Sequence, residues 1–264
     1  QRRVHGDDTD LMAGNPKIMQ ALAIVGLLAT MSEGLNPAGL MLTVVNNCPY
    51  EIYPAIQPNA GFPLLEKGGF HLPSLSHRSF AAPSQRWAGR IWARTGCTFT
   101  NGRFYCATGD CNHQIECNGA GGATPAGLAE FSLHHGPDSS LCSYVVSFVD
   151  GFNIPMTITP HEGKGQCPVV GCRHNLVSMC PANLKFRYPA KSGTTVACMS
   201  ACEAVKSDEV CCLNHFSSPA MCRPSEYSQF FKHNCPATVT YPHDTPSLTN
   251  NCADPRELKI IFCH

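Results

Sequence analysis

Short stretches of alternating apolar and polar residues recur along most of the chain. Residues 40–45 (LMLTVV) and 258–262 (LKIIF) combine this alternation with β-branched side chains, which favours strands. Turn-forming pairs such as Asn101-Gly102 separate the stretches, and helical patterns do not alternate with them. The pattern therefore predicts a mainly β protein, an antiparallel sandwich or barrel. Further strands are expected at 51–56, 78–81, 89–94, 128–134, 144–149 and 155–159.

Residues 166–235 have a different character, because they contain nine of the seventeen cysteines. One helix is predicted at about 195–206 and another at about 225–234, where a proline stands on either side of the helical pattern. Three aromatic residues share one face of the second helix, and we interpret them as core contacts rather than as a ligand site. They are Tyr227, Phe230 and Phe231.

A fourteen-residue apolar run, 18–31, lies near the beginning of the sequence. As a helix it would rise about 21 Å, which is too short for a bilayer core of about 30 Å. A lysine precedes the run and small residues follow it, which is typical of a secretory signal peptide at 12–39 with cleavage within 32–39. Residues 1–11 then read as a leader that is not part of the protein. A buried helix is the alternative, but the run is apolar on every face.

Composition narrows the class of protein. Nineteen basic and nineteen acidic residues cancel, so the chain lacks the positive charge with which proteins bind nucleic acid. A hydrophobic content of 43% excludes intrinsic disorder. Seventeen cysteines without paired C-x2-C spacing indicate disulfides in an oxidising compartment rather than zinc, and no metal or other cofactor is expected.

Residues 102–117 (GRFYCATGDCNHQIEC) contain three cysteines around a Thr-Gly-Asp-Cys core. This segment resembles the signature stretch of the thaumatin-like proteins, and the resemblance extends over 40–264. Other matching stretches are 92–97, 128–131, 149–156, 180–182, 226–232 and 262–263. The resemblance implies a β-sandwich core, a small disulfide-rich loop domain and a disulfide-rich domain of helices and loops. The core would comprise 40–94, 125–173 and 236–264, the small domain 95–124 and the helical domain 174–235.

The same resemblance implies how sixteen of the cysteines pair. The pairs would be Cys48–Cys263, Cys97–Cys106, Cys111–Cys117, Cys167–Cys252, Cys172–Cys235, Cys180–Cys198, Cys202–Cys211 and Cys212–Cys222. Cys142 has no counterpart in this framework. It is either a buried free thiol in a monomer or an exposed thiol that joins two chains.

The resemblance also implies a cleft between the sandwich and the helical domain. Its expected lining comprises Arg94, Glu130, Asp150 and Asp244, and Val145 stands where the family has a further aspartate. Clustered carboxylates raise one another's pKa and accept hydrogen bonds from sugar hydroxyls. If the cleft is catalytic, Glu130 is the expected proton donor and Asp150 the second carboxylate. The alternative is that both carboxylates are structural and pair with Arg94.

The function implied is that of a plant defence protein, which binds β-1,3-glucan of fungal walls through the acidic cleft. A weak endo-β-1,3-glucanase is the enzymatic alternative, and an inhibitor of hydrolases or a taste-active protein is a third. Zero net charge does not favour the taste-active class. Because the sequence ends one residue after Cys263, we expect no membrane anchor or vacuolar address, and secretion to the extracellular space (apoplast).

Overall fold

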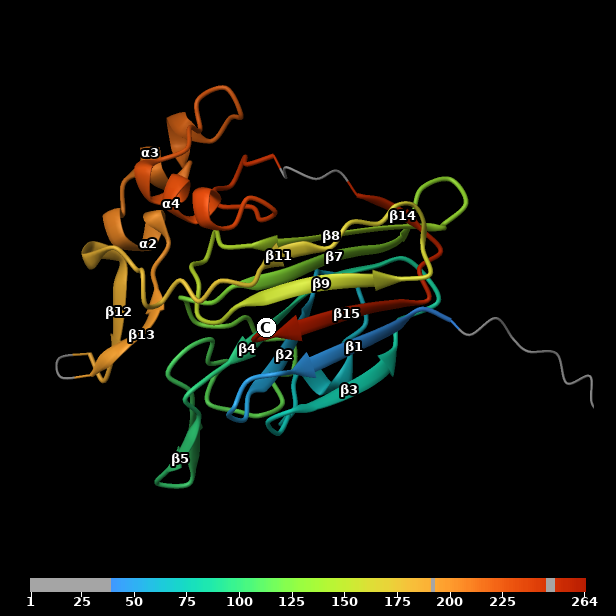
Figure 1. Ribbon diagram of the computed structural model, residues 1–264, viewed down its shortest axis with the longest axis horizontal. Coiled ribbons are helices and arrows are strands. Elements are labelled where there is room, and N and C mark those ends of the chain that lie inside the picture. The colour runs from blue at the N-terminus through green and yellow to red at the C-terminus, as the bar shows by residue number, and fades with distance from the viewer. Residues whose placement is uncertain (1–38, 191–192, 246–249) are drawn as a thin grey trace, which may run out of the picture. The chain divides into compact units, whose positions relative to one another are not determined.

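A computed structural model describes residues 39–190, 193–245 and 250–264 (Figure 1). The expected leader at 1–11 lies outside these residues, as does the expected signal peptide apart from position 39. Eleven of the fifteen described strands belong to two β-sheets. One sheet has the strand order β11-β9-β15-β1-β3 and the other β10-β14-β8-β7-β4-β2.

The five-stranded sheet contains one parallel pair, β1 with β15, among antiparallel neighbours. Its strands are β1 (Met41–Asn46), β3 (Ser76–Ala81), β9 (Met156–His161), β11 (Val170–Cys172) and β15 (Glu257–Phe262). Asn46 lies beside Phe262 at the end of both strands of this pair. Parallel strands end at the same edge of a sheet, so Cys48 and Cys263 meet there and form a disulfide. The other pairs of this sheet are antiparallel, as the predicted fold class requires.

The six-stranded sheet is antiparallel throughout. Its strands are β2 (Tyr53–Pro58), β4 (Trp87–Arg94), β7 (Leu128–His135), β8 (Leu141–Ser147), β10 (Lys164–Gln166) and β14 (Asn251–Ala253). Alternate residues of both sheets form one apolar core, with Val44, Ile91 and Ile260 wholly buried. This is the arrangement of a sandwich, in which every second side chain faces inward. All eight predicted strands are confirmed, with ends that differ by up to three residues.

Residues 174–235 contain the described α-helices and a small hairpin. Its elements are the 3₁₀ turn η2 (Ala182–Leu184), β12 (Lys185–Tyr188), β13 (Thr194–Cys198), α2 (Ala201–Val205), α3 (Asp208–Cys211), the 3₁₀ turn η3 (Asn214–Phe216) and α4 (Glu226–Asn234). The helix predicted at 195–206 is wrong in its first half, because the β-branched residues 194–196 extend as β13 against β12. The helix begins only after Ser200, whose side chain accepts a hydrogen bond from the Glu203 amide.

Helix α4 occupies the range predicted for it. The Ser225 side chain caps its N-terminus by accepting a hydrogen bond from the Ser228 amide. Phe231 is 1% exposed and lies 6.0 Å from Phe148, ring centre to ring centre. Tyr227 and Phe230 also pack against the apolar core, so the interpretation of these aromatic side chains as core contacts is confirmed.

Two smaller elements complete the described chain. The 3₁₀ turn η1 (Glu66–Gly68) precedes β3, and a hairpin of β5 (Thr98–Thr100) and β6 (Arg103–Tyr105) projects from the end of β4 (Figure 1). Its turn is the Asn101-Gly102 pair, in which both residues have positive φ, as a tight two-residue hairpin turn requires.

Eight disulfides join the same cysteines that the family resemblance pairs. They are Cys48–Cys263, Cys97–Cys106, Cys111–Cys117, Cys167–Cys252, Cys172–Cys235, Cys180–Cys198, Cys202–Cys211 and Cys212–Cys222. Cys142 is a free cysteine of β8, directly opposite Cys252 on β14. Its side chain is 0% exposed, which contradicts the alternative that it links two chains. It is a buried thiol.

Candidate functional site

Three adjacent strands place a row of side chains on one face of the six-stranded sheet. Arg90 of β4 lies directly opposite Glu130 of β7, and Glu130 lies directly opposite Val145 of β8. Side chains directly opposite one another project from the same face, and neighbouring strands are about 4.8 Å apart. Glu130 is therefore flanked by a cation on one side and by an apolar side chain on the other.

A hollow of about 410 Å³, which we call the Glu130 hollow, lies over this row. The next row of the same three strands consists of short side chains, which leave space above the sheet. They are Ala88, Ser132 and Ser143. Its lining also includes Asn59, Arg86, Arg90, Phe131 and Val145.

A second hollow of about 570 Å³, the Asp150 hollow, lies where the loop after β8 meets helices α2 and α3. Asp150 is held there by a turn in which the Gly151 amide donates to the Phe148 carbonyl. Gly151 has φ of +93°, and a Cβ at this position would lie 2.6 Å from the Cys198 carbonyl oxygen, so only glycine fits. The lining of this hollow includes Thr124, Asp150, Glu203, Lys206, Arg223 and Tyr241.

Electrostatics connects the two hollows. Burial raises the pKa of Glu130, which the Arg90 guanidinium opposes and the Asp150 charge reinforces. Burial also raises the pKa of Asp150, again opposed by Arg90. Arg90 acts on both carboxylates and Asp150 acts on Glu130, so we treat Arg90, Glu130 and Asp150 as one electrostatic cluster. The structure thus brings together the two carboxylates that the sequence singled out.

Glu203 is a third carboxylate of this cluster that the sequence reasoning missed. Burial raises its pKa, with a further contribution from the Asp150 charge, while a hydrogen bond with Thr124 and the charge of Lys206 oppose it. Its Oε2 is buried without a hydrogen-bond partner among the described residues. The Ser200-x-x-Glu203 spacing was visible in the sequence, but it indicates a helix cap and does not point to a cleft.

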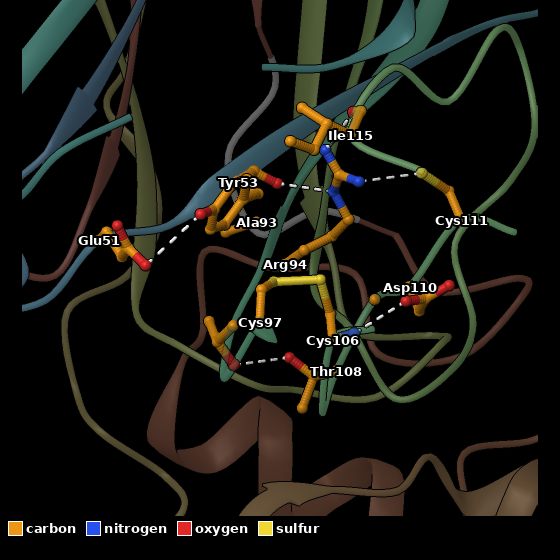
Figure 2. The surroundings of a disulfide bond; sticks show 12 residues. Glu51, Tyr53, Ala93, Arg94, Cys97, Cys106, Thr108, Asp110, Cys111 and Ile115 are labelled. Carbon is orange, nitrogen blue, oxygen red and sulfur yellow. Dashed lines mark hydrogen bonds between the residues drawn. A yellow bond between two sulfur atoms is a disulfide. The ribbon is translucent and has the colours of Figure 1, made fainter. Parts of the chain in front are cut away.

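Arg94 does not line either hollow, so that expectation was wrong. Its side chain is 0% exposed. Figure 2 shows it between Tyr53, Cys111 and Ile115. Nε donates to the Tyr53 carbonyl at 2.8 Å, Nη1 to the Gln114 carbonyl at 2.5 Å and Nη2 to the Ile115 carbonyl at 2.7 Å. Burial lowers the pKa of Arg94 to about 10, against the charges of Asp110 and Tyr53. The arginine near the carboxylates is Arg90.

Asp244 also has a different place from the one expected. Its Oδ2 accepts hydrogen bonds from Lys232 Nζ at 2.9 Å and from the Thr240 amide at 2.9 Å, and its side chain is 8% exposed. These contacts hold the turn that carries Tyr241 into the Asp150 hollow. Asp244 therefore positions a lining residue and offers little surface of its own to a ligand.

Within 39–190, 193–245 and 250–264, no group of three or more His, Cys, Asp or Glu residues could hold a metal ion. Over the same residues, no helix has the length and apolar character that crossing a membrane demands. The described chain is thus a mainly β protein, cross-linked by disulfides, in which a group of carboxylates and one arginine line two surface hollows.

Comparison with known proteins places this class of protein in a family. A sequence model of the thaumatin family matches residues 46–264. An osmotin-like protein of Solanum lycopersicum is 61% identical over 254 residues, which are 96% of this chain and 100% of the relative. The chain belongs to the thaumatin family.

One more relative and one solved structure are similar to this chain. A protein of Prunus avium named glucan endo-1,3-beta-glucosidase is 39% identical over 249 residues, 93% of this chain and 100% of its own. Among solved structures, a thaumatin-like xylanase inhibitor aligns over 84% of this chain and 99% of its own, with 21% identity and a TM-score of 0.46.

Proposed function

We propose that this protein is a secreted defence protein that binds β-1,3-glucan of fungal walls across the Glu130 and Asp150 hollows. The observation that carries the proposal is the cluster of Arg90, Glu130 and Asp150, in which one cation acts on two half-buried carboxylates. Carboxylates accept hydrogen bonds from sugar hydroxyls, and the guanidinium donates them. Tyr241 adds an aromatic ring to the same surface.

Binding to insoluble β-1,3-glucan tests this proposal. Arg90→Ala, Glu130→Gln and Asp150→Asn are each expected to weaken retention about tenfold, the effect of losing one charge-assisted hydrogen bond of about 1.4 kcal/mol. Arg103→Ala and Glu162→Gln are matched controls, because both residues are exposed and lie outside these two hollows. Unchanged retention in all three site variants would contradict the proposal.

Hydrolysis of the same glucan is the second candidate function, supported by the name of the Prunus avium relative and by the carboxyl pair. The raised pKa of Glu130 suits a general acid, and Asp150 would act as base or nucleophile. Incubation with laminarin, followed by measurement of reducing ends, separates the two functions. Binding without new reducing ends would leave a binding protein only.

Secretion is part of the proposal, with residues 12–39 as a signal peptide and the three domains expected from the family resemblance. Eight disulfides support it, because such bonds form and persist in oxidising compartments. Expression of the full chain with a fluorescent C-terminal tag tests it. Signal in the extracellular space is expected, and retention in the vacuole would contradict it.

A further inference from the structure

A third hollow, of about 700 Å³, has lining residues different from those of the two hollows above. We call it the Tyr50 hollow. Its walls come from segments that are far apart in the sequence: the loop before β2, the end of β4, residues 153–155, residues 173–177, strand β13 and residues 263–264. The proposed function does not use this hollow.

Disulfides hold the walls of the Tyr50 hollow in place. Cys97 and Cys263 line it directly and are bonded to Cys106 and Cys48. The Cys172–Cys235 bond adjoins Arg173 in the chain, and the Cys180–Cys198 bond closes the end of β13. Walls fixed in this way lose little conformational entropy when a ligand enters, which favours binding.

The chemistry of the lining is part aromatic, part aliphatic and part polar. Tyr50 is 45% exposed, so part of its side chain is accessible to a ligand. Partial burial of its phenol raises the pKa of the hydroxyl. Its hydroxyl lies 3.9 Å from Cys263 Sγ, a contact that helps to orient the ring. Ile154, Val177 and Val196 supply apolar surface beside it.

The polar groups of the lining are nearly balanced in charge. Glu51 accepts a hydrogen bond from Tyr53 and contacts His71 Nε2 at 2.7 Å. Arg173 is exposed and forms no hydrogen bond or ion pair with another described residue. Burial and the nearby Arg173 charge lower the pKa of His264, which favours the neutral imidazole. Among the side chains of the lining, Arg173 supplies one positive charge and Glu51 one negative charge, which does not favour a strongly charged ligand.

An apolar ligand is also disfavoured, because it would cover Arg173 without giving its five N–H donors a partner. A sugar ring meets both requirements, since it has apolar C–H faces for the tyrosine ring and hydroxyls for Arg173 and Glu51. We propose that the Tyr50 hollow is a second saccharide site, which takes a neutral pyranose oligosaccharide with one sugar ring on Tyr50.

Together with the site of the proposed function, the Tyr50 site would give this protein two saccharide sites. A chain that binds two segments of an insoluble polysaccharide gains avidity beyond either affinity, and it can link neighbouring polysaccharide strands. The Tyr50 site also works by itself, because its lining does not depend on Glu130 or Asp150.

Titration of ¹⁵N-labelled protein with laminarihexaose, cellohexaose and xylohexaose tests the inference. At least one sugar is expected to shift the backbone amide signals of 173–177 and 195–196. The same shifts are expected in the Asp150→Asn variant, which separates this inference from the proposed function. Failure of all three sugars to move these signals would overturn it.

A set of tyrosine variants sharpens the test. Tyr50→Ala is expected to weaken binding at this site at least about tenfold, as truncation of an aromatic anchor does. Tyr50→Phe keeps the ring and is expected to retain binding within about threefold. Tyr188→Ala is the matched control, because Tyr188 is also 45% exposed but lies on β12 outside the hollow. Equal weakening by Tyr50→Ala and Tyr188→Ala would contradict a specific role for Tyr50.

Discussion

Arg90 and Arg94 lie four residues apart on the same strand, yet the two ends of β4 have opposite roles. Side chains of a strand alternate between faces, so both arginines leave the same face of the sheet. At Arg90 this face is open and carries the Glu130 hollow. At Arg94 it is covered, and backbone carbonyls surround the guanidinium (Figure 2).

The cover over the second end is the loop region 95–123, which two disulfides stabilise. Trp92, between the two arginines, donates its indole N–H to the Gly109 carbonyl of this region at 2.8 Å. Gly122 approaches the same indole so closely that a Cβ would lie 2.5 Å from it. An arginine side chain of β4 therefore has a structural role where this loop region covers it, and is a candidate ligand contact where the face is open.

The largest expected effect is on stability at the covered end. Arg94→Met removes the hydrogen-bond donor from the carbonyls of Tyr53, Gln114 and Ile115 and leaves the Tyr53 carbonyl buried without a partner, so we expect a loss of about 3 kcal/mol. In a domain of this size that lowers Tm by about 6–12 °C. Arg90→Met, the matched change at the open end, should alter the free energy of unfolding by less than about 1 kcal/mol. Thermal unfolding followed by circular dichroism measures both, and similar losses would refute the contrast.

A smaller effect concerns pH at the open end. Burial raises the pKa of Glu130 in the folded protein above its ordinary value of about 4.3. The protonated carboxyl therefore stabilises the fold below pH 4.3, and this stabilisation is lost as pH rises through the folded pKa and the carboxyl ionises. Glu130→Gln cannot ionise, so it should raise Tm at pH 7 by about 1–3 °C, with no rise at pH 3. Glu162→Gln removes an exposed carboxylate that pairs with Arg256, and it should give no rise at either pH. A Tm gain that is independent of pH would show that ionisation is not the cause.

The smallest effect on stability is expected at Val145, which lies in the same row as Arg90 and Glu130. Val145→Asp places a carboxylate directly opposite Glu130, and like charges at such positions destabilise a sheet by about 0.2–1 kcal/mol. Tm should fall by about 1–2 °C at pH 7 and recover part of this loss at pH 4, where carboxylates begin to protonate. Val145→Asn, similar in shape without the charge, is the control. The same fall in both variants would indicate lost packing instead of charge.

Much of the architecture was predictable because it depends on local patterns. The alternation at 40–45 and 258–262 indicated β1 and β15, and the flanking prolines indicated α4. The parallel pairing of β1 with β15 was not predictable, since it joins residues more than two hundred positions apart. The helix expected at 195–206 was wrong before Ser200 for a similar reason, because this segment forms a strand by pairing with β12.

The candidate site was predictable only in part. Motifs resembling those of the family pointed to Glu130 and Asp150, which the structure places in one electrostatic cluster. The choice of Arg94 and Asp244 was wrong, because a motif identifies a residue without showing what covers it or bonds to it. Glu203 was missed because its spacing from Ser200 already had an explanation as a helix cap.

The class of protein and the sandwich strands follow from the sequence pattern, and the alternation also gives the face of β4 from which both arginines project. Which arginine is buried and which is available to a ligand depends on the packing of distant segments. The physical reason is that burial depends on what packs over a side chain. A loop region that contains the Cys97–Cys106 and Cys111–Cys117 disulfides packs over Arg94 and does not cover Arg90.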